Sequence, residues 1–179
     1  MPTLDLSSAK GLRVAGVDAL ALRVGNSLVW QAPLTVLYVS NFDTGIDGWV
    51  AAVPADLVLQ TLTSPTPHSG SASLAIQRST TASLDMRCRR SVSGFVVGRR
   101  YRVTASILRV NTTATSALRF GVEGIGDTGT LAPAASTWLT TTYEFTATAT
   151  THAIFATATG TGATTTRRIH LDDVRVDLI

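Results

Sequence analysis

Asn-Phe-Asp-Thr-Gly-Ile-Asp-Gly-Trp at residues 41–49 marks where the main domain of this chain begins, and Leu-Asp-Asp-Val at residues 171–174 marks its end. The first stretch places a carboxylate and two glycines between an apolar strand and a tryptophan of the kind that proteins bury. The second stretch places two carboxylates inside the last strand. Together they predict one closed β-domain, residues 34–179, and leave residues 1–33 as a separate element.

Apolar side chains alternate with polar ones along most of the chain, which predicts strands rather than helices. The last strand contains a change of phase, because Ile169 and Leu171 share one parity while Val174 and Val176 share the other. This slip of one residue predicts a β-bulge at Asp172–Asp173. About eight to ten antiparallel strands, roughly ten residues apart, predict an all-β fold of the β-sandwich class.

Residues 1–33 carry a shorter alternating pattern around the turn-forming residues Gly25–Ser27. The pattern predicts a small β-hairpin element of two or three strands, which cannot bury a core of its own. Its apolar side chains either pad the main domain or dock on a partner surface. The docking candidates are Leu20, Leu22, Leu28 and Trp30.

The composition describes a folded and weakly basic chain. Of its 179 residues, 45% are hydrophobic and 15% are charged, and the net charge is +3. The excess charge comes almost wholly from arginine and is not interleaved with aromatic side chains, so nucleic acid is not expected as a partner. One basic sheet face, either solvated or in contact with an acidic partner, is predicted for Arg87, Arg89, Arg100 and Arg102.

Neither a membrane-spanning segment nor a signal peptide is expected from the sequence. No run of about 18 apolar residues occurs, and the first residues lack the charged and apolar regions of a secretory signal. Cys88 alternates with Leu84 and Met86, which predicts a buried free thiol.

No catalytic motif is found: the sequence has no phosphate-binding glycine loop, no Cys/His zinc spacing and no Gly-x-Ser-x-Gly elbow. His68, His152 and His170 are scattered, and none has an obvious nucleophile beside it. Adjacent Asp172 and Asp173 would point to opposite sides of a regular strand, which makes a poor acid/base pair. The sequence therefore predicts a protein that is not an enzyme.

Five motifs, taken in order, resemble the jelly-roll carbohydrate-binding modules that are attached to xylanases and other glycanases (the family 4, 9 and 22 type). They are residues 41–49, 68–74, 98–103, 138–145 and 171–174. The resemblance covers residues 36–179 and implies an antiparallel jelly roll. It also implies a structural calcium ion held by Asp43 and Asp172, since Ca²⁺ prefers oxygen ligands. The alternative is that Asp43 caps a turn and Asp172 accepts backbone amides at the bulge.

Sugar binding follows less directly from this resemblance. Such modules stack aromatic rings on pyranose faces, yet aromatic residues make up only 6% of this chain. Trp49 and Trp138 occupy positions that are usually core in the family, and most Tyr and Phe residues fall on the apolar parity of strands. The sequence therefore predicts a reused scaffold without a spare aromatic platform.

The segment Val17–Trp30 is similar to a short β-motif at the N-termini of structural proteins in phages of Gram-positive, especially actinobacterial, hosts. The resemblance implies a non-catalytic virion protein, either a capsid decoration or fibre or a minor tail protein. Such a protein would be made in the host cytoplasm, dock on major capsid or tail proteins through residues 1–33, and form homo-oligomers such as trimers. The alternative function is a carbohydrate-binding module that recognises a glycan on the host cell surface, and both functions can hold together.

Overall fold

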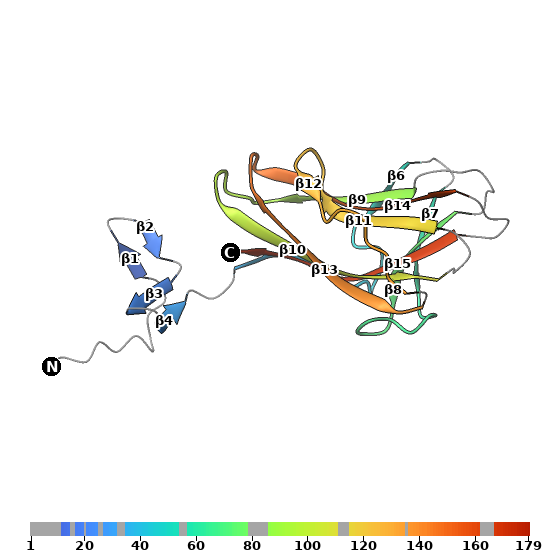
Figure 1. Cartoon of the computed structure of the whole chain (residues 1–179), viewed down its shortest axis with the longest axis horizontal. Helices are drawn as coiled ribbons and strands as arrows, with labels where there is room; N and C mark the ends of the chain where they lie inside the picture. Colours follow the sequence, from blue (N-terminus) through green and yellow to red (C-terminus); the bar gives the residue numbers. More distant parts are fainter. Residues whose placement is uncertain are drawn as a thin grey trace. The chain divides into compact units, whose positions relative to one another are not determined.

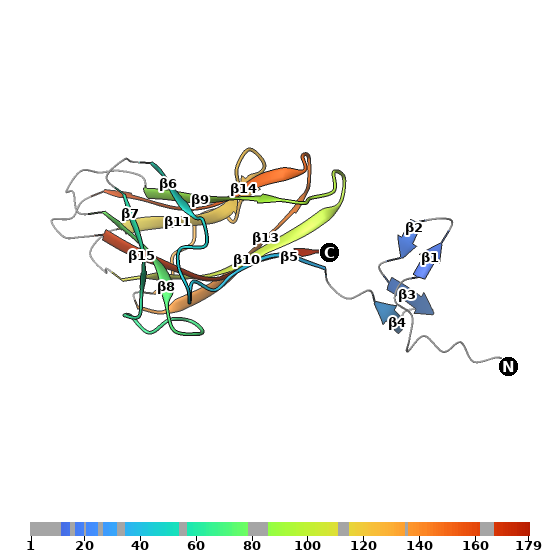
Figure 2. The same cartoon turned by 180° about the vertical axis from the view of Figure 1, so that it is seen from behind.

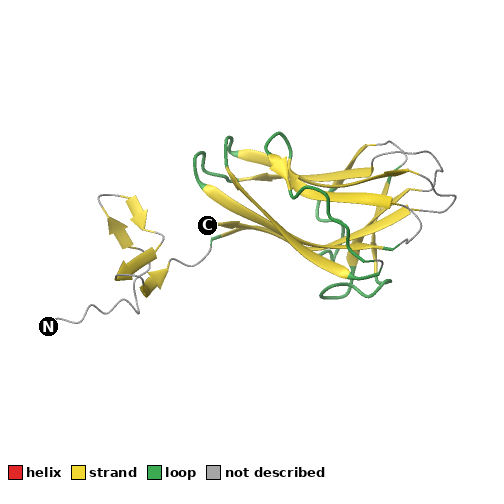
Figure 3. Ribbon diagram, in the orientation of Figure 1, coloured by secondary structure: helices red, strands yellow, loops and turns green. Residues whose placement is uncertain are grey.

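The computed structural model describes residues 12–14, 17–19, 21–24, 27–31, 35–53, 57–78, 86–110, 115–134, 136–161 and 167–179. These residues form strands and loops (Figures 1 and 3). Within them, no helix is long and apolar enough to cross a membrane. The chain divides into two compact units, residues 1–35 and residues 36–178.

The N-terminal unit contains two antiparallel hairpins. In one, β1 (Leu12–Val14) pairs with β2 (Val17–Ala19), and in the other β3 (Ala21–Val24) pairs with β4 (Ser27–Gln31). Of the docking candidates, Leu20 lies outside the described residues. Only the backbone of Leu22, Leu28 and Trp30 is described, and Leu22 pairs with Trp30 across the second hairpin.

The main unit is a sandwich of a six-stranded and a five-stranded antiparallel sheet, which confirms the predicted all-β fold (Figures 1 and 2). The six-stranded sheet contains β5 (Val36–Ser40), β7 (Val58–Leu62), β8 (Ser73–Arg78), β10 (Arg100–Arg109), β13 (Trp138–Thr146) and β15 (Arg167–Leu178). Its order is β13-β10-β15-β8-β7, and β5 pairs with the second half of β15.

The five-stranded sheet contains β6 (Val50–Val53), β9 (Met86–Ser93), β11 (Thr115–Val122), β12 (Gly126–Asp127) and β14 (Thr151–Thr161). Its order is β12-β11-β14-β9-β6. The consecutive strands β9 and β10 therefore belong to opposite sheets. This arrangement decides which side chains can share a surface.

The core lies between the two sheets, where the apolar parities of both meet. Trp49 and Phe42 from the opening stretch are fully buried there, with ring centroids 6.3 Å apart. Asp47 fixes the loop between them and β5, because its Oδ2 accepts hydrogen bonds from the Ser40 hydroxyl (2.6 Å) and the Phe42 N–H (3.3 Å). Cys88 is also buried, as predicted, and burial raises the pKa of its thiol to about 12.

The predicted bulge in β15 is confirmed. Thr104 pairs with Arg175 and Ser106 with Asp172, so one residue of β10 opposes two residues of β15. Asp173 takes a left-handed backbone conformation with φ of 49°. The extra residue allows both apolar stretches of β15 to face the core, and it leaves Asp172 and Asp173 free to reach a neighbouring loop.

Candidate functional site

The candidate metal ligands Asp43 and Asp172 both hold the loop between β7 and β8. Asp172, buried in β15, accepts hydrogen bonds at Oδ2 from the N–H groups of His68 (2.9 Å) and Ser69 (3.2 Å). Asp43 accepts hydrogen bonds at Oδ1 from the N–H and hydroxyl groups of Ser71. The structure thus brings the two predicted carboxylates to one loop, at two separate points along it.

The remaining oxygens of these carboxylates also have donors. Asp172 Oδ1 accepts the N–H of Asp173 (2.8 Å), and Asp43 Oδ2 accepts the side-chain amide of Asn41 (3.0 Å). The backbone N–H of Ser71 lowers the pKa of Asp43, whereas burial raises the pKa of Asp172. Every carboxylate oxygen therefore faces the positive end of an N–H or O–H bond.

This arrangement fits the hydrogen-bonding alternative for the two aspartates. N–H and O–H donors balance the negative charge of both carboxylates in this structure. Across the ranges that the structure describes, no three His, Cys, Asp or Glu side chains gather as a metal site. The calcium ion stays a prediction.

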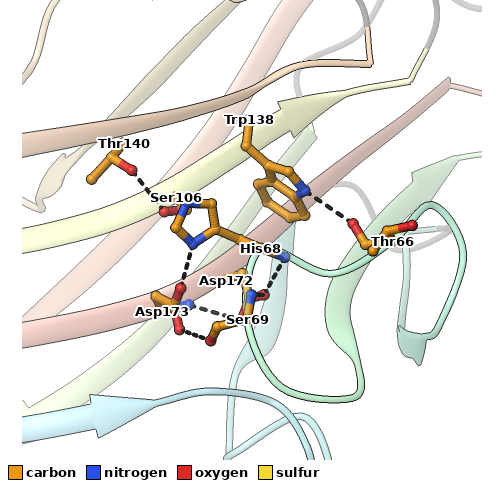
Figure 4. Close-up of polar contacts among 8 residues, drawn as sticks. All are labelled: Thr66, His68, Ser69, Ser106, Trp138, Thr140, Asp172 and Asp173. Carbon is orange, nitrogen blue, oxygen red and sulfur yellow. Dashed lines mark hydrogen bonds and ion pairs between the residues drawn. The ribbon is translucent and has the colours of Figure 1, made fainter.

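Asp173 joins His68 and Ser69 on the solvent side of the same loop (Figure 4). Its Oδ2 lies 2.6 Å from His68 Nδ1, and the Ser69 hydroxyl donates to its Oδ1 at 2.5 Å. The carboxylate stands between the histidine and the serine, whereas a nucleophilic triad needs the histidine between the other two. The cluster therefore fastens the loop and does not activate the serine.

Trp138 lies on the outer face of the six-stranded sheet, so the expectation that it belongs to the core is wrong. Its side chain is half-buried, and its Nε1 donates to the carbonyl of Thr66 at 3.0 Å (Figure 4). It pairs in register with Leu108, which pairs with His170 in β15. The loop between β7 and β8 lies against this row, which explains why an outward-facing Leu108 is 2% exposed.

The four candidate arginines do not form one basic face, and that prediction is wrong. Arg87 and Arg89 point outward from β9 in the five-stranded sheet, whereas Arg100 and Arg102 point outward from β10 in the six-stranded sheet. The two pairs lie on opposite sides of the sandwich because the turn between β9 and β10 carries the chain from one sheet to the other.

Each arginine pair meets one glutamate on its own face. On the six-stranded sheet, Glu144 accepts from Arg100 (2.7 Å) and from two nitrogens of Arg102 (2.7 and 3.0 Å), and the Arg102 hydrogen bond lowers the pKa of Glu144. On the five-stranded sheet, Glu123 receives a hydrogen bond from Arg89 at 3.2 Å. Arg87 stays 3.6 Å from the same carboxylate.

The outer face of the five-stranded sheet contains an open depression. The lining residues are Arg87, Val122, Glu123, Gly124, Ile125, Gly126, Asp127 and Phe155. The depression depends in part on Gly121, since a Cβ at this position would lie 2.3 Å from the carbonyl oxygen of Gly126. Because Gly121 has no side chain, β11 and β12 can pair closely, and their connection forms one side of the depression next to β14.

Phe155 lies in this depression instead of in the core, although it is only 4% exposed. The guanidinium carbon of Arg87 covers the ring at 4.4 Å from its centroid, which is a cation–π contact. Sequence analysis missed this site. The alternation of the sequence shows that Arg119 and Glu123 face the same side of β11. The position of Asp127 beside them depends on the β11–β12 hairpin, which the alternation does not show.

Solved structures share the fold of the main unit. The xylan-binding domain CBM22-1 of Paenibacillus barcinonensis Xyn10C superposes with a TM-score of 0.55 at 14% identity, covering 82% of this chain and 96% of that chain. This chain has the fold of a carbohydrate-binding module. A CBM22-1 module with its catalytic module from Clostridium thermocellum xylanase 10B, complexed with xylohexaose, gives a TM-score of 0.58 at 16% identity. The match covers 80% of this chain and 28% of the xylanase chain.

The carbohydrate-binding-module fold extends to another type of module. TmCBM61 in complex with β-1,4-galactotriose matches with a TM-score of 0.52 at 12% identity, covering 76% of this chain and 89% of that chain. The solved chains that this chain covers almost completely are binding domains, and those with catalytic modules match over a minor part. No protein family and no curated protein matches the sequence. These comparisons give no support to the phage resemblance of residues 17–30.

Proposed function

We propose that the main unit is a non-catalytic carbohydrate-binding module and that its glycan site is the depression on the five-stranded sheet. The observation that carries the proposal is this open, polar depression, which combines the guanidinium of Arg87 with the carboxylates of Glu123 and Asp127. Planar guanidinium and carboxylate groups pair with neighbouring hydroxyls in two-pronged hydrogen bonds. The fold supports the proposal, because solved proteins that share it bind xylan and galactotriose.

A screen of immobilised plant, fungal and bacterial glycans with the full chain tests this function. The informative variant is Glu123→Ala, since Glu123 lines the depression and pairs with Arg87 and Arg89. Its matched control is Glu144→Ala, because Glu144 also bridges two arginines but lies on the opposite face. We expect Glu123→Ala to weaken glycan binding roughly tenfold, the loss that corresponds to about 1.4 kcal/mol. The control is expected to bind normally.

Two results would reject the proposal. One is the absence of binding to every glycan of the screen by a chain whose circular dichroism and melting show that it is folded. The other is glycan binding that Glu144→Ala abolishes and Glu123→Ala leaves intact. The second result would move the site to the six-stranded sheet.

A role in a virion is a second candidate, and one observation favours it. Residues 1–35 form a compact unit separate from the sandwich, as an attachment segment requires. Under this proposal the unit docks on capsid or tail proteins, holds several copies together, and presents the glycan-binding sandwich to the host. Deleting residues 1–33 should abolish incorporation into particles and reduce the oligomer to monomers in light scattering. Continued incorporation of the deleted chain would contradict it.

A further inference from the structure

The outer face of the five-stranded sheet carries more exposed cations than its anions neutralise. The arginine side chains are 39% (Arg87), 48% (Arg89) and 47% (Arg119) exposed, whereas Glu123 is 23% and Asp127 24% exposed. Three guanidinium groups therefore stand above two more deeply placed carboxylates. A ligand that approaches this face meets positive charge first.

Two of these guanidinium groups have unused hydrogen-bond donors. Arg87 stays 3.6 Å from Glu123, and Arg119 stays 3.7 Å from Asp127, both beyond hydrogen-bond distance. Neither guanidinium group makes a hydrogen bond with any residue in the described part of the chain, although each lies within ion-pair distance of one carboxylate. A guanidinium carries five N–H donors in a planar fork that matches carboxylate and phosphate oxygens.

The register of the sheet places these two arginines around one floor. Thr157 of β14 pairs with Arg87 on one side and with Arg119 on the other. The two backbones are thus separated by two strand spacings, about 10 Å. Thr157 is only 6% exposed, so its short side chain lies below the two arginine side chains on either side of it.

Phe155, the aromatic side chain on this face, is buried and cannot contact a ligand. Phe155 is 4% exposed and lies beneath Arg87, so its ring cannot stack on a sugar. The remaining aromatic side chains of the sandwich whose burial is described lie in the core or on the other sheet. Recognition on this face therefore depends on charge and hydrogen bonds instead of stacking.

We infer that the ligand of this face is an acidic glycan, whose carboxylate or phosphate groups bind Arg87 and Arg119 while its hydroxyls meet the carboxylates of Glu123 and Asp127. The inference rests on the proposed glycan-binding function and specifies its ligand class. Guanidinium N–H groups that make no hydrogen bond gain most from an oxyanion, because charge-assisted bonds are stronger than those to neutral hydroxyls. A neutral polysaccharide would leave this charge uncompensated.

The test measures affinity of the full chain in native gels and by calorimetry. The probes are polygalacturonate, which carries carboxylates, phosphomannan, which carries phosphates, and neutral xylan and β-1,4-galactan. We expect binding to one or both acidic polymers, at least tenfold tighter than to the neutral ones, and weakening as salt rises. Which acidic polymer binds identifies the oxyanion.

The variants are Arg87→Gln and Arg119→Gln, and Arg100→Gln on the opposite face is the control with the same change of charge. Each of the first two should weaken acidic-glycan binding about tenfold or more, and the control less than twofold. Arg100 and Arg119 are exposed, so their variants should keep the melting temperature of the full chain. Arg87→Gln gives up the contact with Phe155, so its circular dichroism must match that of the full chain before its binding is compared.

The outcomes separate the two claims. Binding of neutral glycans in preference to acidic ones would overturn this inference while leaving the proposed function intact. Binding of no glycan would reject the proposed function together with it. Duplex DNA bound as tightly as the acidic glycans, or equal losses in Arg100→Gln, would show general attraction of polyanions and also overturn the inference.

Discussion

Asp172 shows how one buried side chain can hold a loop that is remote in sequence. Its carboxylate accepts backbone N–H groups from His68 and Ser69, more than a hundred residues earlier in the chain. The same side chain is fully buried, and burial raises its pKa. The hydrogen bonds compensate for this desolvation, so the residue contributes to stability only while its partners stay in place.

Asp172→Ala should therefore destabilise the domain. It would leave the N–H groups of His68 and Ser69 without an acceptor, at a cost of about 2–4 kcal/mol in the free energy of unfolding. Urea unfolding measures this loss, and Glu144→Ala, at an exposed carboxylate, is the control with a small expected effect. A loss below that of the control would contradict the role given to Asp172.

His152 makes stability depend on pH. Its Nε2 accepts hydrogen bonds from the N–H groups of Thr148 and Ala149, both at 3.2 Å, and its ring packs on Phe95 and Phe145. Accepting at Nε2 requires a neutral ring, and burial lowers the pKa of His152. The unfolded chain therefore binds the proton more readily than the folded one.

The sign of the effect follows from linkage. Because the folded pKa is lower than the unfolded one, this contribution to stability is complete above about pH 6.5 and is lost as the pH falls below it. Burial also lowers the pKa of His170, to about 4, which acts in the same direction. We expect urea midpoints to fall between pH 7 and pH 5, and to fall less in His152→Gln. An identical slope in that variant would contradict this assignment.

At the scale of elements, side chains from two paired strands and their ends hold the loop between β7 and β8. Asp43 lies just after β5 and Asp172 lies within β15, and β5 pairs with β15. Gly70 permits the contact, since a Cβ at this position would lie 2.4 Å from Asp43 Oδ1 and its φ is +62°. The hydrogen bonds of Asp43 and Asp172 can thus supply the structural link that was expected of a calcium ion.

This arrangement predicts that calcium does not stabilise the domain. Melting temperatures in calcium and in EDTA should be equal, because the carboxylate oxygens are already matched with donors. Differential scanning calorimetry of the full chain measures both. A midpoint that rises with calcium would restore the ion that the resemblance implies, and loss of that rise in Asp43→Asn would locate it.

At the scale of the whole molecule, the sandwich and the N-terminal hairpins are separate compact units. Among the described residues, the sandwich has a continuous core that runs from Phe42 to Val176. A chain that begins at Leu34 keeps every residue of this core, so it should melt within about 2 °C of the full chain. A lower midpoint would show that the hairpins pad the sandwich.

Much of the architecture was readable from local alternation. The buried thiol of Cys88 and the bulge at Asp172–Asp173 follow from parity, which depends only on neighbouring residues. The burial of Trp49 follows from its residue type. The placement of Arg87 and Arg100 on opposite faces was not readable, since parity tells which side of its own sheet a residue occupies and not which sheet the strand joins.

The sequence by itself determined the strands, their inward faces and the point where the last strand slips, because each is a property of consecutive side chains. Tertiary pairing decided the rest. It separated β9 from β10, gathered Arg87, Thr157 and Arg119 into one row, and brought Asp172 to the loop at His68. These groupings join residues far apart in the chain, and only the packed sheets bring them within reach of one another.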